Sequence, residues 1–419
     1  MATFGIVVGG GPAPGINGVI GAAATVALKS GARVVGCLDG FKWLMEGDTQ
    51  HVRELTLADV GSVHLRGGSI LHTSRANPTK KAETLEAVVK SLTSLGVDHL
   101  ITIGGDDTAF SARRVAEQAD GRIKVAHVPK TIDNDLPLPA GIPTFGYETA
   151  RELATTIVEN LIEDCETTGR WFFVVVMGRK SGSLALGTGK SAGAPITVIP
   201  EEFPDGTIHL EDVVRTIEGA IVKRLAFEGR ADGVAVIAEG VAERFDQDEL
   251  DFLKDVPRDE HGHIRLAEVP LGKLLKDAVG ESLAARGVKI ATGEKDVGYE
   301  LRCHKPTAFD RDYTRDLGAG AVFTLLSGTY NVLITRRDDQ IVPVPFSELM
   351  DAKTGKTRVR DVDTGTNWFR AARALQTRVE QADLDDPKRL EAIAKAAKLS
   401  PDEAKKRYAP IAWSSTKRR

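Results

Sequence analysis

Short apolar runs that alternate with longer amphipathic segments constrain the fold of this chain more than any other feature. The runs are rich in β-branched residues and apolar on both faces, as buried parallel strands are: FGIVV, ARVVGCL, HLITI, IKVAHV, WFFVVVM, ITVIP and GVAVIA. Helices are predicted between them at Ile16–Lys29, Thr79–Leu95, Thr108–Ala119, Glu148–Glu166 and Leu210–Phe227. This order predicts an α/β fold with doubly wound, parallel-rich sheets, in which ligands bind beyond the carboxyl ends of the strands.

Composition excludes several classes of protein. The 419 residues allow two or three domains, and a net charge of −4 gives no overall positive field for nucleic acid or an anionic membrane. The cysteines Cys37, Cys165 and Cys303 lie far apart, which argues against a disulfide framework or a zinc site. The first residues lack the basic start of a signal peptide, and no apolar run approaches the roughly 20 residues that span a bilayer. We therefore expect a soluble cytoplasmic protein with neither a membrane nor a nucleic-acid partner.

Four glycine-rich turns compete as phosphate sites: GGGPAPGIN, GGSILHTSR, IGGDDT and LALGTGKS. In GGGPAPGIN, after the first strand, Gly9, Gly11 and Gly15 do not have dinucleotide-fingerprint spacing, but backbone N–H groups at a helix start suit a phosphate. A purely structural tight turn is the alternative. LALGTGKS has Leu184 where a P-loop needs glycine, so we reject a P-loop there and expect Lys190 in a solvated loop.

Two aspartates follow the glycines of HLITIGGDDT, where a strand meets a helix. Magnesium prefers few carboxylates together with waters and substrate phosphates. Asp106 is therefore predicted to anchor a magnesium ion. The alternative is that Asp107 or Thr108 only caps the following helix.

A second acidic pair stands in PKTIDND, a proline-rich loop after the next strand. Asp133 and Asp135 flank Asn134, with Lys130 and Thr131 just ahead. Acidic side chains gathered near one centre repel each other, which a purely structural role would not favour. A carboxylate that accepts a proton from an attacking hydroxyl is the base that phosphoryl transfer uses. A calcium loop does not fit, because the spacing lacks the twelve-residue pattern with its terminal Glu.

Further polar groups follow other predicted strands. Arg179 in MGRKSG supplies a planar fork for phosphate, and Glu239 in VIAEG can accept hydrogen bonds from sugar hydroxyls. Tyr299 and Arg302 in YELR add a hydroxyl and a guanidinium. Arg75 in GGSILHTSR is either a phosphate clamp or simply an exposed arginine. Together these strand-end groups suit a phosphorylated sugar.

In this order, the motifs resemble those of the phosphofructokinase family, specifically its pyrophosphate-dependent branch. The resemblance covers roughly residues 1–346 through GGGPAPGIN, GGSILHTSR, GGDDT, PKTIDND, MGRKSG, AEG and YELR. It implies two similar α/β lobes that close over a cleft, with Mg²⁺ as cofactor. It also implies that a phosphoryl group passes reversibly from diphosphate to the 1-hydroxyl of fructose 6-phosphate, in glycolysis and gluconeogenesis.

The resemblance also implies a role for each motif residue. Asp133 would be the general base, Asp106 would serve the magnesium, and Gly11 and Arg75 would lie at the donor. The sugar phosphate would be held by Thr131, Ile132, Asp133, Met177, Gly178, Arg179, Glu239, Tyr299 and Arg302. Arg170 matches a family arginine that reaches a neighbouring subunit's sugar-phosphate site, so we expect a homodimer or a homotetramer.

Asp107 and Lys130 are the residues implied to select the donor and to take part in catalysis. ATP-using relatives carry glycine at both positions, which leaves room for the α-phosphate of a nucleotide. The carboxylate of Asp107 fills that space and repels the phosphate, whereas Lys130 neutralises the departing orthophosphate. An ATP-dependent enzyme is the alternative for the donor, and sedoheptulose 7-phosphate is the alternative acceptor.

Three regions are expected along the chain. Residues 1–145 would form an N-terminal lobe with the donor and metal site, and residues 146–345 a second lobe with the sugar-phosphate site. The chain would cross back to the first lobe near residue 302. Composition shifts near Phe346, and residues 346–419 are expected to form a mainly helical extension, packed on a lobe or placed in a subunit contact.

Overall fold

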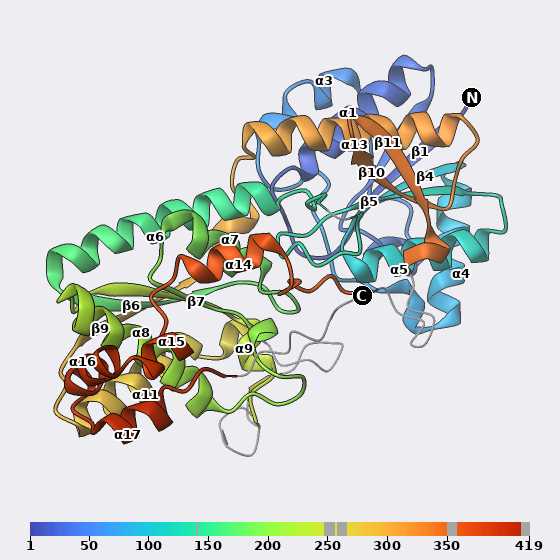
Figure 1. Ribbon diagram of the computed structural model, residues 1–419. Helices are drawn as coiled ribbons and strands as arrows, with labels where there is room; N and C mark the ends of the chain where they lie inside the picture. The colour runs from blue at the N-terminus through green and yellow to red at the C-terminus, as the bar shows by residue number, and fades with distance from the viewer. Residues whose placement is uncertain (140, 247–255, 258–265, 350–357, 412–419) are drawn as a thin grey trace. The chain divides into compact units, whose positions relative to one another are not determined.

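The computed structural model describes residues 1–139, 141–246, 256–257, 266–349 and 358–411. The chain forms two compact units (Figure 1). Unit 1 comprises Met1–Ala150 and Tyr299–Arg360, and unit 2 comprises Arg151–Gly298 and Asp361–Arg419. Each unit is therefore built from two separate stretches of sequence. The domain boundaries expected from the sequence stay a prediction.

Unit 1 contains a seven-stranded sheet in the order β11-β10-β5-β4-β1-β2-β3. Only the pairs β10–β11 and β2–β3 are antiparallel. The strands are β1 (Thr3–Val8), β2 (Arg33–Cys37), β3 (Val52–Glu54), β4 (His99–Gly104), β5 (Lys124–Pro129), β10 (Val332–Arg337) and β11 (Gln340–Pro345). The helices are α1 (Ile16–Lys29), α2 (Lys42–Met45), α3 (Leu57–Val60), α4 (Ala82–Ser94), α5 (Asp106–Ala119), α12 (Tyr299–Arg302) and α13 (Ala308–Leu326), with short 3₁₀ turns at Val63–Leu65, Pro78–Lys80 and Phe346–Leu349.

Helices cover both faces of this sheet because its central strands are apolar on both sides. Phe4, Ile6 and Val8 of β1 belong to a core shared with α1 and α13, which lie side by side (Figure 1). Val7 points the other way, into a second core shared with α4 and α5. Alternate side chains of one strand therefore hold two helical layers.

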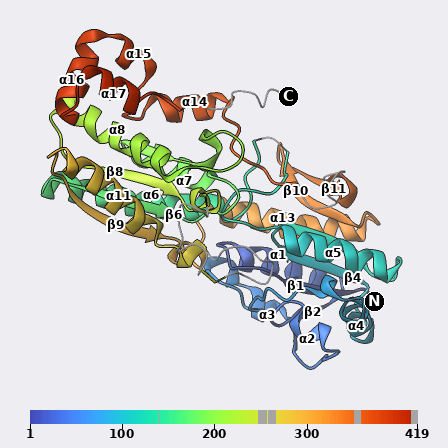
Figure 2. The same ribbon diagram turned by 90° about the horizontal axis from the view of Figure 1, so that it is seen from below.

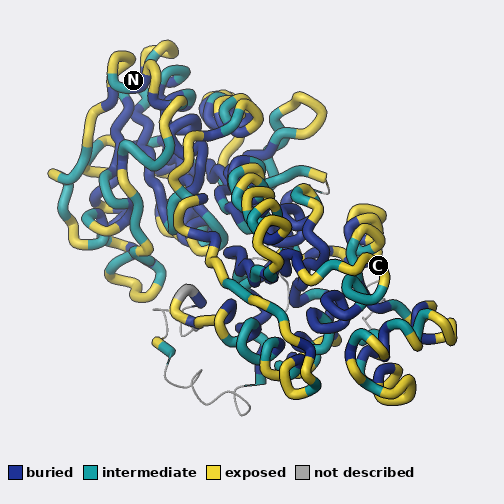
Figure 3. Tube along the Cα trace, turned by 90° about the vertical axis from the view of Figure 1, so that its left-hand side faces the viewer, coloured by how far each residue is buried: buried dark blue, intermediate teal, exposed yellow. Residues whose placement is uncertain are grey.

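Unit 2 contains a four-stranded parallel sheet in the order β7-β8-β6-β9. The strands are β6 (Arg170–Val176), β7 (Ile196–Val198), β8 (Gly233–Ala238) and β9 (Ala291–Val297). Its helices before the C-terminal region are α6 (Tyr147–Thr168), whose first residues up to Ala150 belong to unit 1, α7 (Ser183–Ala192), α8 (Leu210–Glu228), α9 (Gly240–Glu243) and α11 (Leu271–Ala285), with 3₁₀ turns at Pro200–Glu202 and Leu266–Glu268. Trp171 and Phe173 of β6 pack with α8 and α11 in one buried core. Buried segments run through the interior of each unit, with exposed segments around them (Figure 3).

The C-terminal region adds α14 (Asn367–Ala374), α15 (Gln381–Asp385), α16 (Pro387–Ala397) and α17 (Pro401–Arg407). Seen from below, α16 and α17 lie beside α8 (Figure 2). Ile393 and Ala404 join the core of unit 2. From Asp361 onward the expected extension therefore belongs to unit 2, whereas Phe346–Leu349 and Arg360 belong to unit 1. The predicted fold class, with parallel-rich sheets and a mainly helical extension, is confirmed.

Three sequence expectations need correction. Lys190 does not lie in a loop, because Ser183–Ala192 form helix α7, where the Lys190 ammonium donates to the Trp368 carbonyl at 3.2 Å. Helix α4 begins at Ala82 rather than Thr79, after a separate 3₁₀ turn. Helix α5 begins at Asp106, two residues earlier than predicted. Among the helices that the structure describes, none is both long and apolar enough to cross a bilayer.

A buried carboxylate joins the extension to α8. Glu218 is fully buried and accepts hydrogen bonds from Arg407 at 2.7 Å and from Ser282 at 2.8 Å, and also from Arg286 and Tyr408. Burial alone would raise the pKa of Glu218, but the hydrogen bonds from Arg407, Tyr408 and Ser282 outweigh it and hold the pKa below its usual value. The carboxylate therefore stays ionised.

Glu218→Gln is expected to destabilise unit 2 by about 3 kcal/mol, because the partner guanidiniums would lose a buried counter-charge. Urea unfolding followed by circular dichroism measures the change. Glu211→Gln is the matched control, since Glu211 meets the same Arg407 at 3.0 Å but is 63% exposed. The control should change the free energy of unfolding by less than about 0.5 kcal/mol. Equal effects of the two variants would contradict the stabilising role of the buried Glu218 carboxylate.

Candidate active site

The first glycine turn connects β1 to α1. The Gly9 amide donates to the Ile103 carbonyl and the Gly10 amide to the Ser74 carbonyl, both at 2.8 Å. Gly15 has a φ of +103°, a conformation that favours glycine. The turn is thus fixed against β4 and against the segment that carries Arg75.

The second glycine turn lies at the end of the neighbouring strand β4. The N-cap of α5 is Gly105, and no side chain caps the helix, so the interpretation of Asp107 or Thr108 as its cap is wrong. Asp106 and Asp107 instead occupy the first helical turn, where the helix dipole favours negative charge. The Asp107 amide donates to the Asp106 carboxylate at 2.9 Å.

Glycines at these two turns make room for one buried threonine. A Cβ on Gly9 would lie 2.5 Å from Thr108 Oγ1, and one on Gly104 would lie 2.3 Å from Thr108 Cβ. Thr108 is 6% exposed. A side chain at either glycine would force the turns apart, so the glycines are needed to bring the two aspartates close to the first turn.

Lys130 joins the first turn to the loop after β5. Its ammonium donates to the Gly11 carbonyl, and its backbone amide donates to the Gly104 carbonyl at 2.8 Å. Burial lowers the pKa of Lys130 to about 8, and the charge of Arg302 adds to this effect. Asp133 and Asp135 act in the opposite direction, by attraction.

Arg302 and Arg75 also belong to this group. Arg302 lies beside the first turn, with its guanidinium carbon 3.6 Å from the position of a Cβ on Gly11. The same guanidinium stacks over the ring of Tyr299 at 5.1 Å, and the Tyr299 side chain is exposed. Arg75 is exposed, which was one of the two interpretations of this residue. Its charge nevertheless contributes to lowering the pKa of Lys130.

The loop after β5 presents the proposed base. The Asp133 amide donates to Thr131 Oγ1 at 3.0 Å, while Ile132 is buried beneath it. Asn134 has a left-handed φ of +58°. The Thr144 hydroxyl donates to the Thr131 carbonyl at 2.7 Å, which closes the loop at its far end. Asp133 is thus held on a short, internally bonded turn.

A second group of predicted residues lies in unit 2, at the ends of β6 and β8. These strands are neighbours, with Val176 paired to Ala238. The Gly178 amide donates to the Glu239 carboxylate at 3.1 Å, and the Arg179 guanidinium donates to Glu243 at 3.4 Å.

The backbone geometry explains why a glycine occupies position 178 in this second group. Gly178 has a φ of +149°, and a Cβ there would lie 2.8 Å from the Ser181 carbonyl oxygen. The Met177 amide donates to the Val297 carbonyl at 3.0 Å. The predicted site residues therefore form two groups, one in each unit: Gly11, Arg75, Asp106, Asp107, Lys130, Thr131, Ile132, Asp133, Tyr299 and Arg302 in unit 1, and Met177, Gly178, Arg179 and Glu239 in unit 2.

Sequence reasoning missed two supports of these loops. His127 on β5 is fully buried and contacts the Gly104 carbonyl at 3.1 Å. Burial lowers the pKa of His127 to about 3, so the ring stays neutral beneath the turns. Arg360 bonds to the loop around Asn134. The histidine stood in a predicted strand next to the acidic loop and could have been found; Arg360 carried no signal, because it comes 226 residues after Asn134.

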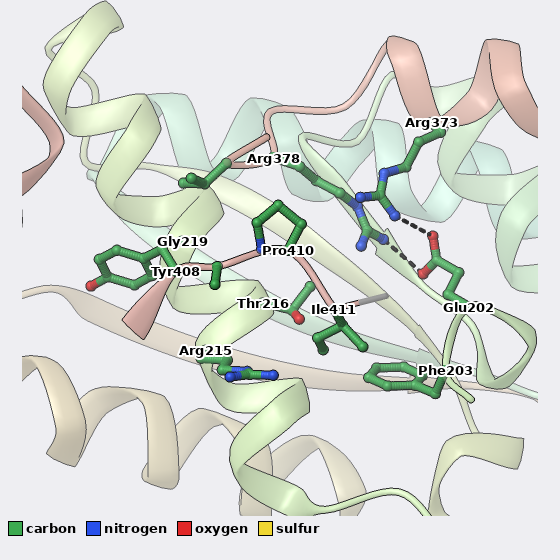
Figure 4. Close-up of a pocket in the computed structure, with 12 residues that line it drawn as sticks. Glu202, Phe203, Arg215, Thr216, Gly219, Arg373, Arg378, Tyr408, Pro410 and Ile411 are labelled. Atoms are coloured by element: carbon green, nitrogen blue, oxygen red, sulfur yellow. Dashed lines mark hydrogen bonds and ion pairs between the residues drawn. The ribbon is translucent and has the colours of Figure 1, made fainter. Parts of the chain in front are cut away.

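A pocket in unit 2 lies between α8 and the C-terminal extension (Figure 4). None of the twelve residues drawn there belongs to the predicted site. The Glu202 carboxylate accepts from Arg378 at 2.8 Å and from Arg373 at 3.4 Å. Arg215 also lines the pocket, so arginines outnumber carboxylates there. The pocket is not the reaction site that the sequence predicts.

The family assignment rests on comparisons with known proteins. The family model described as phosphofructokinase matches residues 3–325. The pyrophosphate–fructose 6-phosphate 1-phosphotransferase of Thermotoga maritima is 52% identical over 419 residues, which cover 99% of this chain and 98% of that protein. The protein of the same name from Naegleria fowleri is 50% identical over 416 residues, covering 97% and 95%.

A solved structure supports the fold. The pyrophosphate-dependent phosphofructokinase from Nitrosospira multiformis superimposes with a TM-score of 0.66 over 91% of this chain and 92% of that one, at 18% identity. At that identity the likeness bears on the fold alone. The resemblance inferred from the motifs is confirmed by the family match: this chain belongs to the phosphofructokinase family.

Proposed function

We propose that this chain transfers a phosphoryl group from diphosphate to the 1-hydroxyl of D-fructose 6-phosphate, giving orthophosphate and D-fructose 1,6-bisphosphate. The names of the relatives from Thermotoga maritima and Naegleria fowleri support this reaction. One observation carries the choice of donor: the ammonium of Lys130 is bound to the first glycine turn, in a charge cluster with Asp133 and Arg302. A compact positive charge at that place suits an inorganic phosphate as leaving group.

The chemistry follows from these charges. Asp133 accepts the proton of the 1-hydroxyl while that oxygen forms a bond to the transferred phosphorus. The bond between this phosphorus and the bridging oxygen breaks, and orthophosphate leaves with the electron pair. Lys130, with Arg75 and the N–H groups at Gly11, stabilises the charge on the departing oxygen. The reverse reaction uses the same groups in reverse order.

Asp106 is the residue proposed to hold Mg²⁺. Among the residues that the structure describes, no three His, Cys, Asp or Glu side chains gather as a complete metal cage. The single carboxylate of Asp106, in the first turn of α5, fits magnesium, which binds through one or two carboxylates together with waters and substrate phosphates. When bound, the ion would neutralise charge on the donor phosphates.

The sugar phosphate is assigned to the remaining residues. Arg179 offers a planar fork for the 6-phosphate, and Glu239 offers a carboxylate for a sugar hydroxyl. Thr131, Met177 and Tyr299 complete this assignment, with the backbone of Ile132 and Gly178 and the guanidinium of Arg302. A homodimer or homotetramer in the cytoplasm remains the expected setting.

A panel of donors and acceptors tests the proposed function. The purified chain is given fructose 6-phosphate or sedoheptulose 7-phosphate with diphosphate or ATP, in Mg²⁺ or in EDTA. Diphosphate with Mg²⁺ should support turnover, and EDTA should abolish it. The kcat/KM for ATP should be at least about 30-fold lower than that for diphosphate, which corresponds to about 2 kcal/mol of repulsion between Asp107 and a nucleotide phosphate. Rapid turnover with ATP and none with diphosphate would overturn the proposal.

The lowered pKa of Lys130 predicts a pH dependence. The ammonium is the low-pH form, so kcat/KM for diphosphate should fall about tenfold per pH unit above its pKa of about 8. Lys130→Met has no titrating amine at this position, so its kcat/KM should not show this decrease at high pH. Because the ionisation of diphosphate affects both proteins alike, the ratio of their rates isolates the lysine. A ratio that stays constant from pH 7 to 9.5 would contradict the prediction.

A further inference from the structure

Arg360 makes an unusually complete set of contacts with the loop that carries Asp133. Its backbone amide donates to the Asp135 carbonyl at 2.8 Å. Its guanidinium donates from Nε to the Asn134 carbonyl at 2.9 Å and from Nη1 to the Ile142 carbonyl at 2.7 Å. Nη2 donates to the Asn134 side-chain oxygen. All three guanidinium nitrogens therefore bind one loop.

The loop needs such a partner, because its backbone is bent into an unfavourable conformation. Asn134, directly after Asp133, adopts a left-handed φ of +58°. Asparagine tolerates this region better than most residues, but the conformation persists only when surrounding contacts determine it. The Asn134 side-chain oxygen accepts from the Thr144 amide at 3.0 Å as well as from Arg360. The two sides of the loop are thus tied through one amide group.

We propose that Arg360 is a positioning residue for the reaction: it fixes the Asn134 turn and thereby aims the Asp133 carboxylate at the acceptor hydroxyl. This inference rests on the proposed function, in which Asp133 is the base. Arg360 touches no reacting atom in this account and acts only through the loop. It also lies outside residues 3–325, the part of the chain that the family model matches.

Arginine suits this role for a geometric reason. The guanidinium is planar and presents its N–H groups in a fixed fork, so it can hold carbonyls from Asn134 and Ile142 at once. A lysine ammonium at the same place is a single point donor on a flexible stem and could satisfy one of them. Arg360→Lys should therefore keep the charge and lose much of the positioning.

The first test compares Arg360→Ala with Arg358→Ala. Arg358 lies in the same short segment and donates to the Glu348 carbonyl, away from the Asp133 loop. Arg360→Ala should lower kcat about 10²-fold, the cost of misplacing a reacting group by about 1 Å, with little change in KM. Arg358→Ala should leave kcat within about twofold, and millimolar guanidinium should restore part of the activity of Arg360→Ala. A kcat of Arg360→Ala within twofold of wild type would overturn the proposal.

The second test separates positioning from a general effect on stability. Arg360→Ala is repeated in an Asp133→Asn background. If Arg360 works through Asp133, its loss should cost little more once the base is gone. An equal fold-loss in both backgrounds would overturn the proposal. Should Arg360→Ala not fold, Arg360→Lys carries the same comparison, with an expected loss of kcat at an unchanged melting temperature.

The outcomes distinguish this inference from the proposed function. If Asp133→Asn alone keeps the wild-type kcat, the proposed base is wrong, whatever Arg360 does. If Asp133→Asn loses activity while Arg360→Ala and Arg360→Lys do not, the base stands and the positioning role is rejected.

Discussion

Asp133→Asn is expected to lower kcat by about 10²–10⁴-fold, the usual contribution of a positioned general base. The amide has the shape of the carboxylate but cannot take the proton of the 1-hydroxyl. Binding of fructose 6-phosphate should change little, so the loss should appear in kcat and not in KM. Initial rates with diphosphate, and in reverse with orthophosphate and fructose 1,6-bisphosphate, measure it, and both directions should fall together because they share one transition state.

Asp135→Asn is the matched control for this variant. It makes the same chemical change two residues away, in a loop where both carboxylates influence the pKa of Lys130. If the loss came from altered charge around Lys130, the two variants would behave alike. A much smaller loss for Asp135→Asn assigns the effect to proton transfer. An unchanged kcat of Asp133→Asn would remove that residue from the chemistry.

The largest change in specificity is expected from Asp107→Gly combined with Lys130→Gly. At ~4 Å, two unit charges interact with roughly 4 kcal/mol at an effective dielectric near 20. Even half of that repulsion between Asp107 and a nucleotide phosphate would disfavour ATP about 30-fold. Removing the carboxylate should therefore admit ATP. Removing the ammonium should lower kcat/KM for diphosphate by about 10²–10³-fold, as the loss of one charge-stabilising donor does.

The two single variants separate these effects. Asp107→Gly alone should gain ATP use while it keeps most diphosphate activity. Lys130→Gly alone should lose diphosphate activity without gaining ATP use. Steady-state kinetics with both donors measure the four proteins side by side. If the double variant keeps the diphosphate kinetics of the wild type, the two residues do not select the donor.

The sequence predicted the parts of the fold that follow from buried apolar strands. All seven predicted strands are present, because β-branched runs such as FGIVV and HLITI can be buried on both faces only inside a covered parallel sheet. Four described strands were missed, namely β3, β9, β10 and β11. The sequence of β9, ATGEKDV, is polar. This strand lies at the edge of its sheet, where most of its side chains are exposed and no apolar pattern is needed.

Local motifs predicted which residues cluster, but not the contacts that join distant segments. Gly104, Lys130 and Asp133 could be placed together because β4 and β5 are consecutive strands whose carboxyl ends meet. The position of Arg302 beside Gly11 and the contacts of Arg360 depend on chain that returns to unit 1 after residue 298. Single-sequence patterns carry no information on such long-range pairings.

The late return of the chain bears on how the protein is made. Strand β5 pairs with β4 on one side and with β10 on the other, and β10 begins only at Val332. While the ribosome is still adding the residues between them, β5 is an open edge that another nascent chain could join. The apolar face of helix α1 likewise stays uncovered until α13 has been made. Unit 1 is therefore completed late in translation. Chaperones would be needed most while only the N-terminal half of the chain has been made.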